Sequence, residues 1–162
     1  MILYHGSNLD IKSIDLSFSK KGKDFGIGFY LNDNLLQAQK MAERTTSRMA
    51  TGTATVSAFE FDETCLHAPN GLNVKIFEDY SVEWAQFVLE NRKNKTGESP
   101  HPYDIVVGPI ANDTVGVQIR RFLMGILSIE DLIKELRFNA DRAVQYFFGS
   151  EKAIALLKKI SL

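Results

Sequence analysis

The sequence predicts an α+β fold, and three observations favour this class. Short segments rich in branched and aromatic residues, such as 2–5 and 144–148, have the composition of β-strands. Longer segments, such as 113–122 and 128–136, carry apolar residues at helical spacing behind a capping residue. The two kinds of segment follow one another in mixed order, without the regular strand and helix alternation of a parallel α/β fold.

The first third of the chain contains two expected strands and one helix. Residues 2–5 form a buried strand that stops at Gly6, and residues 28–31 form a second strand that is entered through glycines. Residues 32–34 offer Asn and Asp caps for the helix that follows. We expect this helix to pack in the core through one face that contains Leu35, Ala38, Met41 and Ala42.

The middle of the chain predicts two further strands, a helix and a loop. Residues 53–61 alternate between apolar and polar side chains, and residues 72–77 repeat that pattern. Ser81 opens a helix that runs towards Arg92. The Lys, Gly, Ser and Pro content of residues 93–102 is typical of an exposed loop, which we expect to be the most mobile segment.

The last third begins with a strand over residues 104–109. Two helices follow it, one capped by Asp113 and one capped by Ser128. Residues 144–148 return to strand composition. Ser150 then caps a final helix that we expect to contain Ile154, Leu157 and Lys158.

Bulk properties indicate one domain over residues 1–162 and exclude several functional classes. A chain of 162 residues can bury roughly 70% of the surface that it exposes when unfolded. Its 19 basic and 20 acidic residues give a net charge of -1, so no global charge favours nucleic acid or a membrane, and a local basic groove stays open as an alternative. The single Cys65 excludes an intramolecular disulfide, and we interpret it as a packed thiol. The first residues resemble a strand and not a signal peptide or membrane span, so we expect a cytoplasmic protein.

Two short segments marked by glycine are the candidate functional region. The first is His5-Gly6-Ser7, and the second is Phe25-Gly26-Ile27-Gly28-Phe29-Tyr30-Leu31. Because glycine has no Cβ, it often stands where a ligand or another backbone approaches a strand closely. The two segments therefore predict a pocket between two neighbouring strands, with a bulge or tight turn as the structural alternative. Their spacing does not match the dinucleotide fingerprint Gly-x-Gly-x-x-Gly.

In this order and at this separation, the two segments resemble motifs of the ADP-ribosyltransferase superfamily, in its diphtheria-toxin-like and poly(ADP-ribose) polymerase branch. In that branch a His-Gly-Ser or His-Gly-Thr strand end precedes a Phe-Gly-x-Gly-x-Tyr-Phe segment. Residues 103–109 and 144–148 are also similar to segments of a small bacterial family with this fold, so the resemblance covers nearly the whole chain. It implies a split β-sandwich around an NAD cleft, with flanking helices.

The resemblance also assigns roles to individual residues. His5 is expected to bond the adenosine ribose, and the main chain of Gly6 to hold the nicotinamide carboxamide, supported by Ser7. Tyr30 is expected to stack on the nicotinamide ring. Gly26 and Gly28 are expected to keep the backbone between the motifs close to NAD and unobstructed. The alternatives are a packed histidine and a core aromatic residue.

Gln145 stands where many relatives have a catalytic glutamate on a late strand. Its amide can orient a ribose or an acceptor through hydrogen bonds, but it cannot act as a carboxylate base. This departure argues against growth of a poly(ADP-ribose) chain. It leaves the transfer of a single ADP-ribose, NAD hydrolysis, or a protein with weakened catalytic activity. The alternative is that Gln145 is only a polar residue of a strand.

Other polar residues are interpreted structurally. His67 and His101 are expected to face solvent, and no His and Cys spacing predicts a zinc site. Four acids are candidates for a general base, but each also has a structural interpretation. Asp104 and Asp113 are expected to flank a strand or cap a helix, and Glu83 and Glu90 to lie on a solvated helix face. Lys20, Lys21 and Lys23 form a basic run that can approach NAD phosphates, guide a nucleic acid, or simply be an exposed loop.

Together these inferences predict a metal-independent mono-ADP-ribosyltransferase that uses NAD as the ADP-ribose donor. The resemblance further implies a bacterial toxin or defence effector with a macromolecular acceptor, protein or nucleic acid, and an antitoxin as a partner. An NAD glycohydrolase and a noncatalytic module that binds NAD or ADP-ribose are the alternatives. None of these readings requires a membrane.

Overall fold

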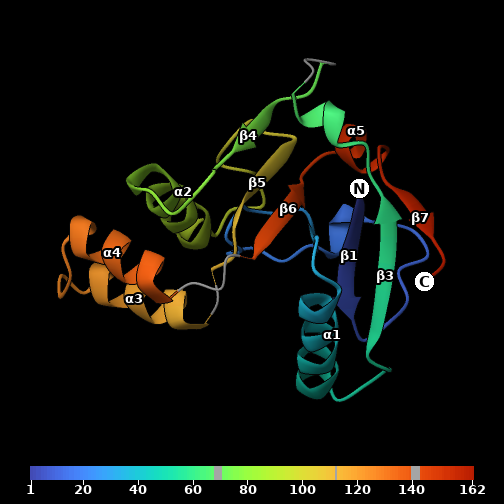
Figure 1. The fold of residues 1–162 in the computed structure, drawn as a ribbon, viewed down its shortest axis with the longest axis horizontal. Coiled ribbons are helices and arrows are strands. Elements are labelled where there is room, and N and C mark those ends of the chain that lie inside the picture. Colours follow the sequence, from blue (N-terminus) through green and yellow to red (C-terminus); the bar gives the residue numbers. More distant parts are fainter. Residues whose placement is uncertain (68–70, 112, 140–142) are drawn as a thin grey trace.

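The computed structural model describes residues 1–67, 71–111, 113–139 and 143–162, without the side chains of residues 113, 114, 138 and 139. Within this part the fold is α+β, as predicted, and seven strands form one mixed sheet (Figure 1). The strand order is β4-β5-β6-β2-β1-β3-β7. Only β4 and β5 pair in parallel, and every other neighbouring pair is antiparallel. The strands are β1 (Ile2–Ser7), β2 (Phe29–Asn32), β3 (Thr55–Glu60), β4 (Val74–Ile76), β5 (Ile105–Pro109), β6 (Val144–Phe148) and β7 (Lys158–Ile160).

The described helices are α1 (Leu35–Met49), α2 (Val82–Lys93), α3 (Asp113–Leu123), α4 (Ile129–Asn139) and the short α5 (Glu151–Ile154). Two 3-10 turns cover Leu16–Phe18 and Glu63–Leu66. Figure 1 shows α2, α3 and α4 gathered beside the half of the sheet that contains β4, β5 and β6, whereas α1 lies beside β1.

Four predicted caps are confirmed by hydrogen bonds. The side chains of Asn34, Ser81, Ser128 and Ser150 accept from main-chain N–H groups in the first turns of α1, α2, α4 and α5. Each bond satisfies one of the donors that the start of a helix leaves without an intrahelical partner. The predicted cap at Asp113 lies outside the described side chains, although α3 begins at that residue.

The sheet separates two apolar clusters. Because side chains alternate along a strand, Val106 and Phe147 face the first cluster, with α2, α3 and α4. The residues on either side of them in β5 and β6 face the second cluster, which also contains Leu3 and α5. Both faces of β5 and β6 are therefore buried, which explains their nearly continuous apolar sequence.

The junction between β1 and β2 differs from the rest of the sheet. Six residue pairs join β1 to β3, but only the pair Tyr4 and Asn32 joins β1 to β2. Instead of the two opposed sheets that the resemblance implies, the structure has one sheet whose two halves meet at this single pair. The two strands that carry the glycine segments are nevertheless neighbours, as predicted.

Two predictions about packing were wrong in part. The final helix stops at Ile154, and Lys158 belongs to the edge strand β7 because its segment pairs with β3. In α1, Ala38 and Ala42 are buried, but Met41 is 48% exposed and Leu35 is 36% exposed. The helix contacts β1 so closely that only its alanine stripe fits against the strand.

Two further observations concern Cys65 and the helices. Cys65 is half-buried against the second cluster, which confirms its interpretation as a packed thiol. Within the described residues, no helix has the length and apolar character needed to cross a membrane.

Candidate functional site

The predicted site residues lie in two groups on either side of the β1–β2 junction. His5, Gly6 and Ser7 form the end of β1, where this strand has parted from β2. Gly26 and Gly28 lead into β2, Tyr30 lies within β2, and Gln145 lies on β6 directly opposite Asn32 of β2. The structure therefore places all seven residues on three adjacent strands or the loop that enters them.

His5 spans the opening between the two strands. Its Nδ1 lies 2.7 Å from the main-chain oxygen of Tyr30, and its ring stacks on Phe29 with a centroid distance of 4.6 Å. Because a carbonyl oxygen only accepts, Nδ1 must carry the hydrogen. Burial is the main reason why the pKa of His5 is lowered, so the neutral imidazole is favoured.

The side chains of His5 and Tyr30 lie on opposite faces of the sheet. The His5 ring contacts Phe29, whereas the Tyr30 ring packs edge-on against Phe147 in the first cluster. The His5 side chain therefore contacts the main chain of Tyr30 and not its ring. Gln145 has the same strand parity as Phe147 and so shares the Tyr30 face.

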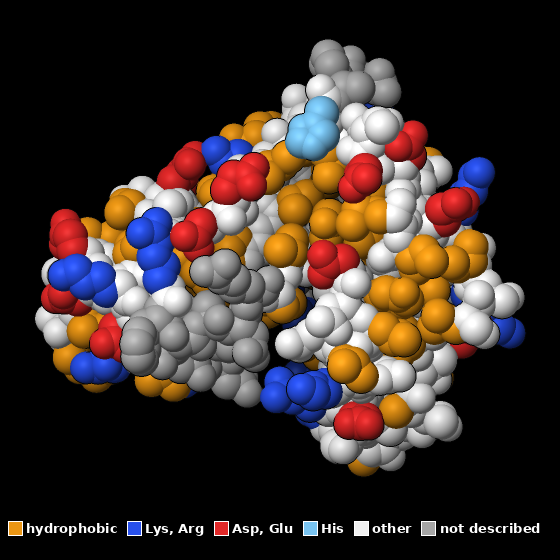
Figure 2. Space-filling view, viewed as in Figure 1, with side chains coloured by type: hydrophobic (Ala, Val, Ile, Leu, Met, Phe, Trp, Pro, Cys, Tyr) orange, Lys and Arg blue, Asp and Glu red, His pale blue; other side chains and the backbone are white. Residues whose placement is uncertain are grey.

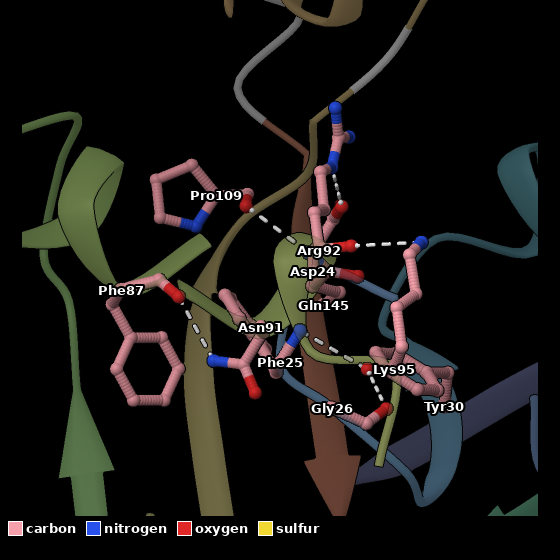
Figure 3. A network of polar contacts seen from close by, with 10 residues as sticks. All are labelled: Asp24, Phe25, Gly26, Tyr30, Phe87, Asn91, Arg92, Lys95, Pro109 and Gln145. Atoms are coloured by element: carbon pink, nitrogen blue, oxygen red, sulfur yellow. Dashed lines mark hydrogen bonds and ion pairs between the residues drawn. The ribbon is translucent and has the colours of Figure 1, made fainter. Parts of the chain in front are cut away.

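The Tyr30 hydroxyl closes the turn that precedes its own strand. It donates to the Gly26 oxygen at 2.7 Å and accepts from the Phe25 N–H at 3.1 Å (Figure 3). Burial raises the pKa of Tyr30 well above its usual range, so the hydroxyl keeps its proton and both bonds persist. The hydroxyl is thus committed to the turn, and Tyr30 as a residue is half-buried.

The packing and backbone of the chain itself explain why Gly6, Gly26 and Gly28 are glycines. A Cβ on Gly6 would lie 1.9 Å from the Ala38 oxygen, and one on Gly28 would lie 2.2 Å from the Phe147 ring. Gly26 has a φ of 94°, a backbone conformation that other residues rarely adopt. Close packing and the turn conformation are therefore sufficient to explain the three glycines, and no ligand is needed to explain them.

Gln145 belongs to a buried polar network. It is 9% exposed, and its amide donates to the Pro109 oxygen at 3.3 Å and to Asp24 at 3.5 Å. Asp24 in turn forms an ion pair with Arg92, with an Nε to Oδ1 distance of 2.7 Å (Figure 3). The network fastens the start of the second glycine segment to the end of α2.

Sequence reasoning missed His101, which was expected to face solvent. Its Nδ1 accepts from the Tyr103 N–H, so Nε2 carries the hydrogen and donates to the Phe25 oxygen at 2.9 Å. The ring also packs on Phe87 with a centroid distance of 4.8 Å. Burial lowers the pKa of His101, in keeping with a neutral ring that needs one donor and one acceptor.

Asn91 was also missed, and only the structure reveals it. Its side chain is buried and donates to the Phe87 oxygen, while its Oδ1 has no hydrogen-bond partner within the described residues. That oxygen would lie 2.8 Å from a Cβ on Gly26, so it faces the Gly26 backbone (Figure 3). A helical asparagine gives no sequence signal of such a contact.

The structural interpretations of other polar residues hold. Asp104 accepts from the Asn73 N–H at 2.8 Å and flanks its strand. Glu83 and Glu90 are exposed on α2, where Glu83 pairs with Lys75, and His67 is exposed as predicted. Among the described residues, no group of three His, Cys, Asp or Glu side chains is arranged to hold a metal ion.

Comparison with protein families identifies the family of this chain. The profile of a family described as a protein of unknown function, DUF3990, matches residues 1–159. No significant match was found among curated proteins or among solved structures. Because the match covers almost the whole chain, the protein belongs to this DUF3990 family.

Proposed function

We propose that this member of the DUF3990 family is an NAD-dependent mono-ADP-ribosyltransferase. The reaction would break the bond between the nicotinamide and its ribose, release nicotinamide, and join the ribose carbon to an acceptor that loses a proton. The observation that carries the proposal is the junction of the two motif strands. The strands that resemble the two NAD-binding motifs are neighbours, and beyond Tyr4 they part with His5 held between them.

The arrangement suits the binding of a flat, polar ligand beside β2. The turn from Asp24 to Gly28 is held by bonds from Ser19, Tyr30, His101 and Arg92, so little conformational freedom would be lost when a ligand binds. Tyr30 is half-buried, and its ring would supply an aromatic surface for the nicotinamide. Part of the rate enhancement would come from holding the ribose and its leaving group in a reactive geometry.

Gln145 limits the chemistry that we propose. A neutral amide can bond a ribose hydroxyl but cannot accept a proton from an acceptor as a carboxylate does. Mono-transfer to an acceptor that is already nucleophilic is therefore the reaction that fits best. A toxin or defence role with a neutralising antitoxin belongs to this same proposal.

A noncatalytic module that binds NAD or ADP-ribose is the second candidate. The observation that favours it is that the Gln145 amide is already bonded to Pro109 and Asp24. In this state the amide is held by the protein and not displayed to a substrate. A binding module would hold NAD without releasing nicotinamide.

The test is nicotinamide release from NAD by the purified protein, in buffer and with cell lysate as a source of acceptors. A transferase should release nicotinamide mainly with lysate, whereas equal release in buffer would indicate a glycohydrolase. His5→Ala and Tyr30→Ala should abolish release while remaining folded. His67→Ala removes an exposed histidine elsewhere and should leave release unchanged.

Two outcomes would contradict the proposal. Undiminished release by folded His5→Ala and Tyr30→Ala variants would remove the proposed site. Binding of NAD without release under any condition would favour the noncatalytic module.

A further inference from the structure

Six of the 19 basic residues of the chain belong to two four-residue segments, 20–23 and 92–95, which contain no acid. The segments are far apart in sequence but lie side by side in the fold. The Lys21 ammonium donates to the Lys95 oxygen at 3.3 Å, and a Cβ on Gly22 would lie 3.5 Å from the Arg92 oxygen. We call Lys20, Lys21, Lys23, Lys93 and Lys95, together with Phe18, the lysine surface.

The lysines of the lysine surface form no ion pair within the described residues, although the Asp24 carboxylate lies near Lys23. Arg92 is paired with Asp24, but the five lysines have no carboxylate within ion-pair distance among the described residues. Partial desolvation, followed by the nearby charge of Arg48, lowers the pKa of Lys23, so the C-terminal end of α1 adds a further cation. On the face shown in Figure 2, by contrast, basic and acidic side chains are interspersed.

Phe18 is exposed to solvent and precedes Lys20 by two residues in the chain. At 83% it has the largest exposed fraction among the large apolar side chains of the described residues. Its position is fixed, because Leu16 packs on the second cluster and Ser19 exchanges two hydrogen bonds with Gly28, at 2.7 and 2.8 Å. An exposed aromatic ring on an anchored turn is a suitable platform for a flat partner.

We propose that the lysine surface binds single-stranded nucleic acid. Proteins that bind single strands combine a positive surface that follows the phosphates with aromatic rings on which unpaired bases stack, and this surface contains both. A duplex would use only the charges, because its bases are already stacked.

The surface adjoins the candidate site, because Ser19 is bonded to Gly28 of the second glycine segment. A bound strand would therefore lie beside the NAD site and serve as the acceptor. That extension rests on the proposed function. The binding itself does not, and it is tested without NAD.

The experiment measures fluorescence anisotropy of a labelled 12-nucleotide single strand of mixed sequence, as DNA and as RNA, titrated with the full chain at several salt concentrations. The expected result is saturable binding to at least one of these strands, with log affinity falling linearly as log salt rises, by about 0.7 per phosphate neutralised. Phe18→Ala should weaken binding about tenfold, in line with the loss of one stacked base. Lys20→Ala combined with Lys21→Ala should weaken binding at low salt and make the salt dependence shallower.

Matched controls separate this surface from general effects. Met124→Ala removes a side chain that is 74% exposed on another part of the molecule, and Lys152→Ala removes an exposed lysine of α5. Both should bind as the parent does. No binding to either strand at low salt would overturn the proposal, as would equal binding to a duplex or a Phe18→Ala variant with unchanged affinity. Binding to anionic vesicles but not to the oligonucleotides would identify a membrane surface instead and would also overturn it.

Discussion

The two glycine segments are held in very different ways. The turn from Asp24 to Gly28 is bonded by side chains from several other parts of the chain. The end of β1 is paired with β3 on one side, but towards β2 it has only the pair at Tyr4 and the contact from His5. The second segment is therefore held by many side-chain bonds, whereas the first has few contacts towards β2, although β3 and α1 support it from other sides. A ligand between the two segments would meet a preorganised surface on the second.

The largest expected effect comes from replacing a closely packed glycine of either segment by alanine. Gly6→Ala should cost about 3 kcal/mol or more in the free energy of unfolding, because the new Cβ would overlap the α1 backbone at Ala38. Gly28→Ala should have a smaller cost, because its closest contact is the Phe147 ring, although the Phe148 oxygen would lie 2.7 Å away.

Urea unfolding of both variants checks this prediction. Gly97→Ala is the control, because a Cβ there has no atom within 4 Å, and it should leave stability nearly unchanged. A Gly6→Ala variant as stable as the parent would show that α1 does not press on β1 as described.

The next effect comes from breaking the ion pair between Arg92 and Asp24, which holds the turn before β2. Arg92→Met should lower the free energy of unfolding by about 2 kcal/mol, because Asp24 is only 17% exposed and would keep a single weak partner in Gln145. The double variant with Asp24→Asn should recover part of this loss, since no unpaired carboxylate remains. Chemical denaturation of the two single variants and the double variant forms a cycle, and purely additive losses would contradict a direct interaction.

How far the sequence predicted this site depends on the kind of contact. Six of the seven strands of the described residues, four helix caps and the adjacency of the motif strands were predicted from local sequence patterns, whereas β7 was not. His101 was misplaced because its partner, the Phe25 oxygen, is 76 residues away and a lone histidine before a proline gives no sign of it. Asp24, Arg92 and Asn91 were missed for the same reason. The final helix was overextended because Lys158 also fits helical spacing, and only pairing with β3 decides for a strand.

A smaller effect is expected from the Tyr30 hydroxyl. Tyr30→Phe keeps the ring against Phe147 but removes the two bonds to the Phe25–Gly26 turn, which should cost about 1 to 2 kcal/mol. Tyr4→Phe is the matched control, because the Tyr4 hydroxyl has no hydrogen-bond partner among the described residues. Thermal and urea unfolding should rank the two variants clearly, and equal stability would mean that the turn does not depend on the phenol.

A further effect, which appears only at low pH, is a pH dependence shared by the two neutral histidines. Burial lowers the pKa of His5 and of His101 below the ordinary value of 6.5. Below pH 6.5 the unfolded chain therefore binds more protons at these two residues than the folded chain does. Stability should therefore fall as the pH drops below 6.5, by at most about 1.4 kcal/mol per pH unit for each histidine, and should not change above that value on their account.

His5→Asn and His101→Gln separate the two contributions, because each keeps a donor at the position of the nitrogen that bonds a carbonyl. Unfolding measured between pH 5.5 and 7.5 should show a shallower slope in each variant. An unchanged slope in both would show that neither histidine is held neutral.

The most direct test of the account is hydrogen exchange with and without NAD, read peptide by peptide. NAD bound between the two segments should protect amides in residues 2–8 and in residues 24–31, with the larger gain at the end of β1, where the sheet is open. Residues 151–162 should exchange as before and serve as the internal control. No protection at saturating NAD, or protection confined to another part of the chain, would contradict the claim that these two segments form the NAD site.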